Sequence, residues 1–254
     1  MKKALMIALS ILFVVVMIFA GCRKTSSVSI SSAEIIPTPV PTTPPLPPKG
    51  PMLDDMEIDP QNQNNWGGYW YTYDDLKDGG TSYAVPWSDA RCELAGVPVK
   101  EFFMQSPGHG GTGMAARVTG EVTTVFTYGF VGIGTGLTDP KGPVDISGCE
   151  GIRFWTKGDG KQYRVKIQSV SPLFLLGAGD NYYGYTFTAP ADWTQVDVPF
   201  TALTQEPYWG TTVALTDSLA MSSDVQFQTV GQPHASINLW VDEIEIYGCP
   251  DYNF

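Results

Sequence analysis

The stretch from Asp180 to Phe200 constrains the fold of this chain more than any other. Large aromatic side chains fall there on every second residue, at Tyr183, Tyr185 and Phe187, so they share one face of a strand. After a short polar turn the alternation resumes over residues 195–198. The pattern predicts a hairpin of two strands. One of its faces carries aromatic rings with hydroxyl groups, a surface suited to stacking on the flat apolar face of a sugar.

Shorter alternating runs recur along the chain, and no segment of ten or more residues has helical periodicity. Glycine-rich turns separate these runs. Many short strands with such turns predict an all-β fold, an antiparallel β-sandwich. A phase slip at residues 242–243 predicts a β-bulge in the last strand. The strands are expected at residues 118–126, 151–157, 163–168, 224–230 and 239–247.

The first 21 residues have the pattern of an export signal, with Lys2 and Lys3 followed by a largely apolar run. The run ends at Cys22 after small residues, which resembles a bacterial lipobox and predicts lipidation of Cys22. An uncleaved signal anchor is the alternative, because the apolar run approaches the length of a bilayer span. Either outcome ties the chain to a membrane, and we expect a lipid-anchored protein of the bacterial cell envelope.

Residues 22–51 are rich in Ser, Thr and Pro, and eight of the chain's prolines lie between Pro37 and Pro51. Such a segment favours extended polyproline II, so we expect a disordered linker. Residues 52–254 are long enough for one well-buried domain. The predicted organisation is therefore a signal at 1–21, a linker at 22–51 and one folded domain at 52–254.

The net charge of −11 argues against a nucleic acid or an anionic lipid surface as partner, since both require a basic footprint. Contact with a membrane is then expected through the lipid alone. With 16% charged and 12% aromatic residues, the composition suits a neutral ligand.

Three cysteines remain after Cys22, and an exported compartment favours one disulfide. Cys149 precedes one expected strand and Cys249 follows the last, so antiparallel neighbours would bring them together. We favour the Cys149–Cys249 pair, and Cys92 with Cys149 is the main alternative.

Several segments resemble family 11 carbohydrate-binding modules and the wider galactose-binding-like jelly rolls. The domain of complex I intermediate-associated protein 30 shares the pattern. The resemblance spans Leu53 to Tyr247. It is carried, in order, by Met52-Leu53-Asp54-Asp55-Met56-Glu57, Asn65-Trp66-Gly67-Gly68-Tyr69, Gly113-Met114, Gly151-Ile152-Arg153-Phe154-Trp155, Tyr185 with Trp193 and Pro199-Phe200, and Val241-Asp242-Glu243-Ile244. It implies a jelly roll that binds β-glucan chains in a tyrosine-lined cleft and carries structural calcium.

The resemblance also implies which residues bind the sugar chain. By position these are Tyr69, Trp70, Tyr128, Phe130, Tyr185, Tyr208 and Trp209. Expected polar partners are Asp180, Asn181, Gln226 and Gln228, of which the last two alternate outward with Val225 and Phe227. This chain departs from the family in an insertion at residues 83–110 and in two added aromatics, Tyr71 and Tyr73.

Calcium requires six to eight hard oxygen ligands. Asp55 and Glu57 are expected on one face of the first strand, and Asp242 on the last strand, its neighbour in many such sandwiches. These three carboxylates are the predicted calcium ligands. Ordinary solvated surface acids are the alternative.

We predict no catalytic residues. A glycosidase needs two carboxylates across a cleft, for which Asp180, Asp192 and Glu206 are candidates, but any acidic sequence offers such pairs. The predicted function is non-catalytic binding of a β-glucan-like polysaccharide in support of glycan-degrading enzymes. The alternative is a protein-interaction or assembly domain of the intermediate-associated-protein type.

Overall fold

The computed structural model describes residues 48, 50–58, 62–99, 102–174, 176, 179–207 and 209–250. The predicted export signal, the lipidation site Cys22 and nearly all of the predicted linker lie outside these residues.

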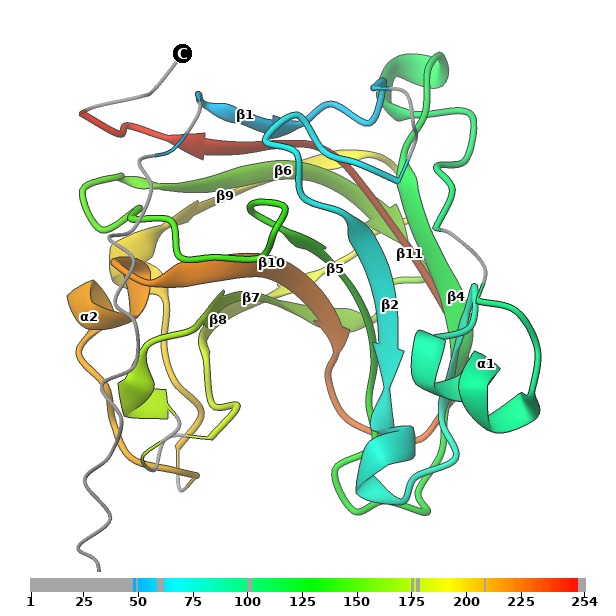
Figure 1. The fold of residues 1–254 in the computed structure, drawn as a ribbon. Coiled ribbons are helices and arrows are strands. Elements are labelled where there is room, and N and C mark those ends of the chain that lie inside the picture. Colours follow the sequence, from blue (N-terminus) through cyan, green and yellow to red (C-terminus); the bar gives the residue numbers. More distant parts are fainter. Residues whose placement is uncertain are drawn as a thin grey trace, which may run out of the picture. The chain divides into compact units, whose positions relative to one another are not determined.

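Two antiparallel sheets form the fold (Figure 1). One has the order β3-β4-β11-β6-β9, with β1 also paired to β11, and the other has the order β2-β5-β10-β7-β8. The all-β antiparallel sandwich predicted from the sequence is therefore correct. The strands are β1 (Met52–Asp54), β2 (Trp70–Asp74), β3 (Tyr83–Val85), β4 (Ala116–Val122), β5 (Val131–Gly136), β6 (Gly151–Gly158), β7 (Gln162–Ser169), β8 (Tyr183–Thr188), β9 (Thr194–Pro199), β10 (Ser222–Thr229) and β11 (His234–Tyr247).

The helices of the described residues are short. They include α1 (Asp89–Ala95), α2 (Leu215–Leu219) and the 3-10 turns η1 (Asp75–Asp78), η2 (His109–Gly111) and η4 (Phe200–Ala202). None of the helices in this part of the chain is both long and apolar enough to cross a membrane.

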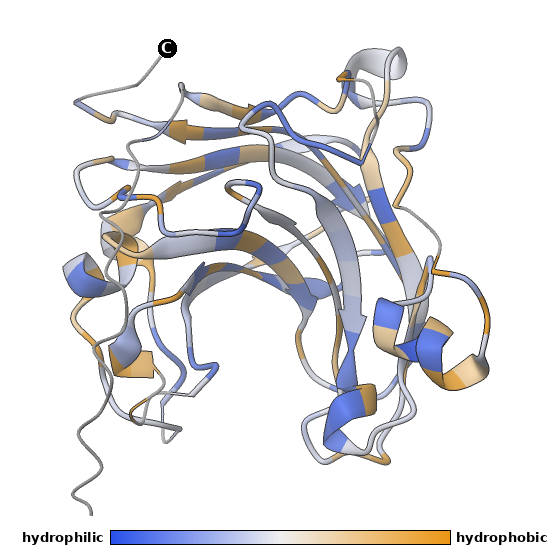
Figure 2. Ribbon diagram, in the orientation of Figure 1, coloured by the Kyte–Doolittle hydropathy of each residue, from blue (hydrophilic) through white to orange (hydrophobic). Residues whose placement is uncertain are grey.

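Alternation along the strands separates a core face from an outer face, as Figure 2 shows by the change of colour along β7 and β10. On β7, Tyr163, Val165 and Ile167 are buried between the sheets. Phe154 of β6 lies 5.0 Å from Phe227 and 5.1 Å from Phe187 by ring centroids. Burying side chains of this kind contributes about 1.5–3 kcal/mol each, so this cluster holds the two layers together.

The hairpin predicted over residues 180–200 is wrong in its pairing. The two strands exist, but β8 pairs with β7 in one sheet and β9 pairs with β6 in the other. The connection after β8 crosses the edge of the sandwich beside the connection between β6 and β7. There Gly160 N donates to Ala189 O at 2.8 Å, and Ala189 N donates to Lys161 O at 3.0 Å. Backbone hydrogen bonds between the β6–β7 connection and the β8–β9 connection therefore take the place of the strand pairing expected within a hairpin.

The C-terminal strand contains the predicted bulge. Its register against β6 shifts between Asp242 and Glu245, and Glu243 has a φ of 46°. The first and last strands are neighbours, as expected, with Met52 opposite Glu245. However, β1 ends at Asp54, so Asp55 and Glu57 follow the strand and do not share one of its faces. Met56 between them has a φ of 62°.

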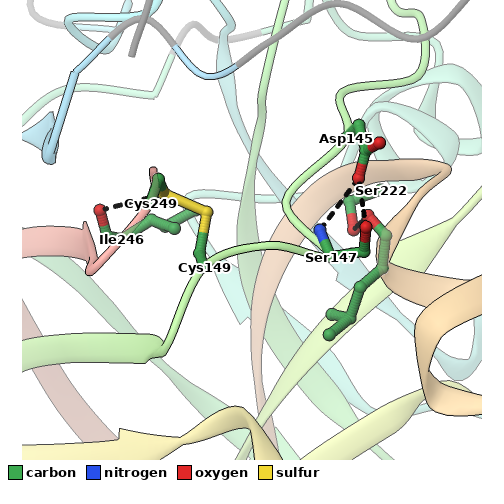
Figure 3. The surroundings of a disulfide bond; sticks show 7 residues. Asp145, Ser147, Cys149, Ser222, Ile246 and Cys249 are labelled. Carbon is green, nitrogen blue, oxygen red and sulfur yellow. Dashed lines mark hydrogen bonds between the residues drawn. A yellow bond between two sulfur atoms is a disulfide. The ribbon is translucent and has the colours of Figure 1, made fainter. Parts of the chain in front are cut away.

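Cys149 and Cys249 form a disulfide beside the end of β11 (Figure 3). This is the pairing favoured from the sequence over Cys92 with Cys149. Cys92 is a free thiol, buried on α1. The disulfide joins residues 100 positions apart, so it ties the chain before β6 to the end of the last strand.

Candidate functional site

The outer face of the five-stranded sheet gathers polar and aromatic side chains. This sheet bends, with its hollow side turned away from the six-stranded sheet (Figure 1). The core-facing residues of its strands include Ile133, Val165 and Phe227, so the residues between them face the hollow side. Cross-strand registers place these outer residues side by side. We call this surface the polar floor: Tyr71, Tyr73, Arg164, Lys166, Gln168, Asp224, Gln226 and Gln228.

Two tyrosine rings of β2 lie across the neighbouring strand. A Cβ added to Gly134 would lie 2.8 Å from Tyr71 Oη, and one added to Gly132 would lie 2.4 Å from Tyr73 Cζ. Glycine at these two positions leaves the space that the rings occupy. The rings lie 6.1 Å apart, and Phe130 continues the row 6.0 Å from Tyr73. The result is a strip of aromatic surface along one side of the polar floor.

A hydrogen-bond network fixes the middle of the polar floor. Tyr71 Oη donates to Asp224 Oδ1 at 2.9 Å and accepts from Gln226 Nε2 at 2.9 Å. Gln226 also donates to Gln168 Oε1 at 3.0 Å. Burial, and then the charge of Asp224, raise the pKa of Tyr71 well above its ordinary value. Tyr71 is therefore a neutral hydroxyl at physiological pH.

The polar floor also contains two cationic side chains, Lys166 and Arg164. Lys166 Nζ donates to Gln228 Oε1 at 2.7 Å and lies 5.8 Å from the centre of the Tyr73 ring. Burial lowers the pKa of Lys166 to about 8. The guanidinium of Arg164 donates from Nη2 to the carbonyl of Thr204, and burial lowers its pKa. Aromatic rings, amides, a carboxylate and two cations thus share one surface.

A second feature is a pocket of about 480 Å³ between the segment after β1, the loop around η2 and the bulge of β11. All three predicted calcium ligands, Asp55, Glu57 and Asp242, line it, together with His109 and Glu243. The sequence prediction did not anticipate these last two residues.

Backbone amides already engage the carboxylates of this pocket. Asp242 accepts from His109 N at 2.7 Å through Oδ2 and from Glu243 N at 2.8 Å through Oδ1. Glu57 Oε1 accepts from Met114 N at 2.6 Å. Burial raises the pKa of Asp242 to about 6, because the hydrogen bonds offset only part of the desolvation. Each oxygen keeps a further lone pair, so the donor chemistry suits a hard cation. As the side chains lie, no three His, Cys, Asp or Glu of the described residues converge closely enough to hold a metal ion.

The predicted sugar-binding residues lie in different places. Phe130 adjoins the polar floor through Tyr73. Tyr128 is 76% exposed in the loop between β4 and β5, where its ring packs edge-on against Phe126. Tyr69 and Trp209 are also exposed. Tyr208 lies outside the described residues.

Two of these residues lie away from the polar floor. Trp70 is a core residue, 4% exposed, which stacks on Phe102 and donates to Asp54 Oδ2 at 2.6 Å. Tyr185 lies on the core-facing side of the edge strand β8, in register with Val165. Tyr185 is 37% exposed at this edge, but because it shares that side with buried Phe187, it does not belong to the polar floor.

Among the expected polar partners, Gln226 and Gln228 lie on the polar floor. Asn181 is buried and donates to the carbonyl of Glu206 at 2.9 Å, and Asp180 accepts from Tyr182 Oη at 3.1 Å. The floor residues absent from the prediction are Tyr71, Tyr73, Arg164, Lys166, Gln168 and Asp224. Alternation with the core residues of β2, β7 and β10 is the signal that identifies them.

The fold is similar to that of solved carbohydrate-binding modules. A family 11 module of the cellulosomal cellulase Lic26A-Cel5E from Clostridium thermocellum matches with a TM-score of 0.50 and 19% identity, over 81% of this chain and 99% of the module. A family 11 module from the same organism, in complex with a β-1,3-1,4-mixed-linked tetrasaccharide, matches with a TM-score of 0.49 and 20% identity, over 80% of this chain and 97% of the module. At these identities the likeness is one of fold.

A search among curated proteins found no match. The family model of complex I intermediate-associated protein 30 matches residues 59–235. This range covers more than half of the chain and includes β2 to β10. The chain therefore belongs to the complex I intermediate-associated protein 30 (CIA30) family.

Proposed function

We propose that the polar floor binds a polysaccharide, a β-glucan-like chain, without cleaving it. The observation that carries the proposal is the pair of tyrosine rings, Tyr71 and Tyr73, which lie over the glycines of β5 beside Gln226 and Gln228. A pyranose ring has an apolar C–H face, and desolvating that face against an aromatic ring contributes about 1–2 kcal/mol. The neighbouring amides offer donors and acceptors to the hydroxyl groups on the rim of the sugar.

The proposed ligand is a polymer because the floor is extended. Its side chains come from β2, β10 and β7 of the five-stranded sheet, and its aromatic strip runs from Tyr71 past Tyr73 to Phe130. Several consecutive sugar units would contact such a surface, and each unit would add a small increment of binding free energy. Mixed-linkage β-glucan is the first polysaccharide to test, as the sequence resemblance implies.

Calcium is proposed as a structural ion of the pocket beside β11. Asp55, Glu57 and Asp242 would hold it after rotation of their side chains. A bound divalent cation offsets the repulsion among these carboxylates and would hold the segment after β1 against the last strand.

The protein is proposed to act at the bacterial cell envelope, anchored by lipid at Cys22 and holding glycan for degrading enzymes.

Family membership and an exposed apolar segment favour a second candidate function, that of a protein-interaction or assembly domain. The segment between β3 and β4 exposes several large apolar side chains, which are Trp87, Leu94, Val97, Val99 and Phe103. An exposed apolar group of this kind is typical of a surface that a partner protein covers.

Affinity electrophoresis of the purified full-length protein tests the proposal. Gels would contain mixed-linkage β-glucan, xylan, mannan or no polysaccharide. Retardation in a polysaccharide gel that free oligosaccharide reverses supports glycan binding. Equal mobility in all gels, with a protein co-purifying from the native host, would instead support the assembly role.

A further inference from the structure

The two cations of the polar floor, Arg164 and Lys166, lack carboxylate partners among the described residues. Arg164 and Lys166 occupy outer positions of β7, opposite Gln228 and Gln226 of β10. The ion pairs among the described residues involve other side chains. The buried carboxylate of the floor, Asp224, pairs instead with Lys141 at 2.7 Å. Both floor cations therefore lie on a largely desolvated surface without a direct counter-charge.

Arg164 also has an unused hydrogen-bond donor. Its side chain is largely buried, with the residue 8% exposed, and its Nε has no hydrogen-bond partner in the structure. Leaving a buried charged donor unpaired is energetically unfavourable. Nε lies 2.7 Å from the position that a Cβ of Gly184 would take. Gly184 of β8 is opposite Lys166, so a Cβ at residue 184 would be on the polar-floor side of the sheet. Arg164 Nε therefore lies on that same side.

Neighbouring acids act on these cations from a distance. Asp180 and Glu206 both favour the charged form of Lys166, and Glu206 favours that of Arg164. Neither acid forms an ion pair with them. These acids therefore compensate the charges of the two cations only in part.

We infer that the polysaccharide held on the polar floor carries carboxylate groups, as uronic acid units do, and that Arg164 and Lys166 bind such groups. This inference rests on the proposed function and adds the charge of the ligand to it. A guanidinium presents its N–H groups as a fork that matches the two oxygens of a carboxylate, and charge-assisted hydrogen bonds are about twice as strong as neutral ones. A neutral hydroxyl would satisfy one donor and leave both charges uncompensated.

The aromatic strip and the cations would then have separate roles. Lys166 Nζ lies over the Tyr73 ring, 5.8 Å from its centre, so a sugar in contact with this ring would bring its C6 substituent close to the ammonium group. Stacking is indifferent to the oxidation state of C6, whereas the cations distinguish a carboxylate from a hydroxymethyl group.

Two ligands of identical backbone test the inference. One is mixed-linkage β-glucan, and the other is the same glucan oxidised at C6 to glucuronate units. Their affinities for the full-length protein would be measured by calorimetry at low and at high salt. We expect the oxidised chain to bind at least tenfold more tightly at low salt, with most of this advantage lost at high salt.

Substitutions test whether Arg164 and Lys166 cause the preference for the oxidised glucan. Arg164→Gln and Lys166→Gln should each remove most of the preference for the oxidised chain over the neutral chain. Arg153→Gln is the matched control, because Arg153 is a cation of the other sheet, paired with Asp197. This variant should keep the preference.

The outcomes separate the inference from the proposed function. Equal or tighter binding of the neutral chain overturns the inference and leaves polysaccharide binding in place. A preference for the oxidised chain that survives both floor variants also overturns it. Failure of both chains to bind overturns the inference and the proposed function together.

Discussion

The side chain of Tyr71 occupies the space in which a side chain of residue 134 would lie. A Cβ on Gly134 would stand 2.8 Å from Tyr71 Oη and 2.9 Å from its Cζ, and the third atom it would meet belongs to the side chain of Gln226. The placement of this ring on the polar floor therefore depends on glycine at residue 134.

Gly134→Ala should displace the Tyr71 ring and weaken polysaccharide binding about tenfold, equivalent to about 1.4 kcal/mol. The fold should remain, because every close neighbour of the added methyl group is a side-chain atom. Affinity electrophoresis and circular dichroism measure the two effects. Gly142→Ala is the control, since its Cβ would have ordinary contacts at 3.8 Å or more. Unchanged affinity in Gly134→Ala would remove the ring of Tyr71 from the ligand contacts.

Chelation should destabilise the protein if calcium occupies the pocket at Asp55, Glu57 and Asp242. We expect EDTA to lower the midpoint of thermal unfolding, added calcium to restore it, and Asp242→Ala to abolish the difference. Asp197→Asn should retain it, because Asp197 lies outside this pocket and pairs with Arg153. A melt that is insensitive to both EDTA and calcium would mean that these carboxylates are ordinary surface charges.

Binding of a carboxylated glycan should depend on pH through Lys166. Burial lowers its pKa to about 8, Asp180 and Glu206 act in the opposite direction, and Arg164 adds to the lowering. A bound carboxylate favours the charged amine and so raises this pKa. Affinity should then be full below about pH 8 and fall as the pH rises through the pKa of the complex.

The pH series has two internal controls. Binding of the neutral glucan should be flat over the same range, and Lys166→Arg should flatten the profile of the oxidised glucan, because arginine stays charged. Parallel declines for both glucans would show that another group, or a loss of structure, controls the pH dependence.

Removal of the Cys149–Cys249 disulfide should lower the free energy of unfolding. The bond closes a loop with a sequence separation of 100, and removing a native disulfide typically costs about 2–5 kcal/mol. Urea unfolding of the Cys149→Ser/Cys249→Ser variant measures the loss. Reducing agent should destabilise both the parent protein and Cys92→Ala but leave the double variant unchanged. Sensitivity of the double variant to reductant would contradict the assignment.

The alternation of residues along β7 and β10 predicted the strands and their two faces, because burial of one face requires a period of two. It also placed Gln226 and Gln228 outward. The pairing of strands was not predictable in the same way, since β8 and β9 are adjacent in sequence but belong to different sheets.

The position of Tyr185 shows a related limit. Alternation shows that Tyr185 and Phe187 share a face, but only packing of Phe187 against Phe154 shows that this face is the core. Conversely, Tyr71 and Tyr73 were visible as added aromatics, and their place on the floor follows from registers with β5 that local sequence does not specify. The disulfide was easier to predict from the sequence, because both cysteines flank the ends of predicted neighbouring strands.

The most direct test of the account compares Tyr73→Ala with Tyr185→Ala, two tyrosines on opposite faces of the same sheet. Calorimetry would measure the affinity of each full-length variant for the polysaccharide that retards the parent protein. The account predicts a loss of about tenfold, or about 1.4 kcal/mol, for Tyr73→Ala and unchanged affinity for Tyr185→Ala. Loss of binding in Tyr185→Ala with full affinity in Tyr73→Ala would contradict the polar floor as the binding surface.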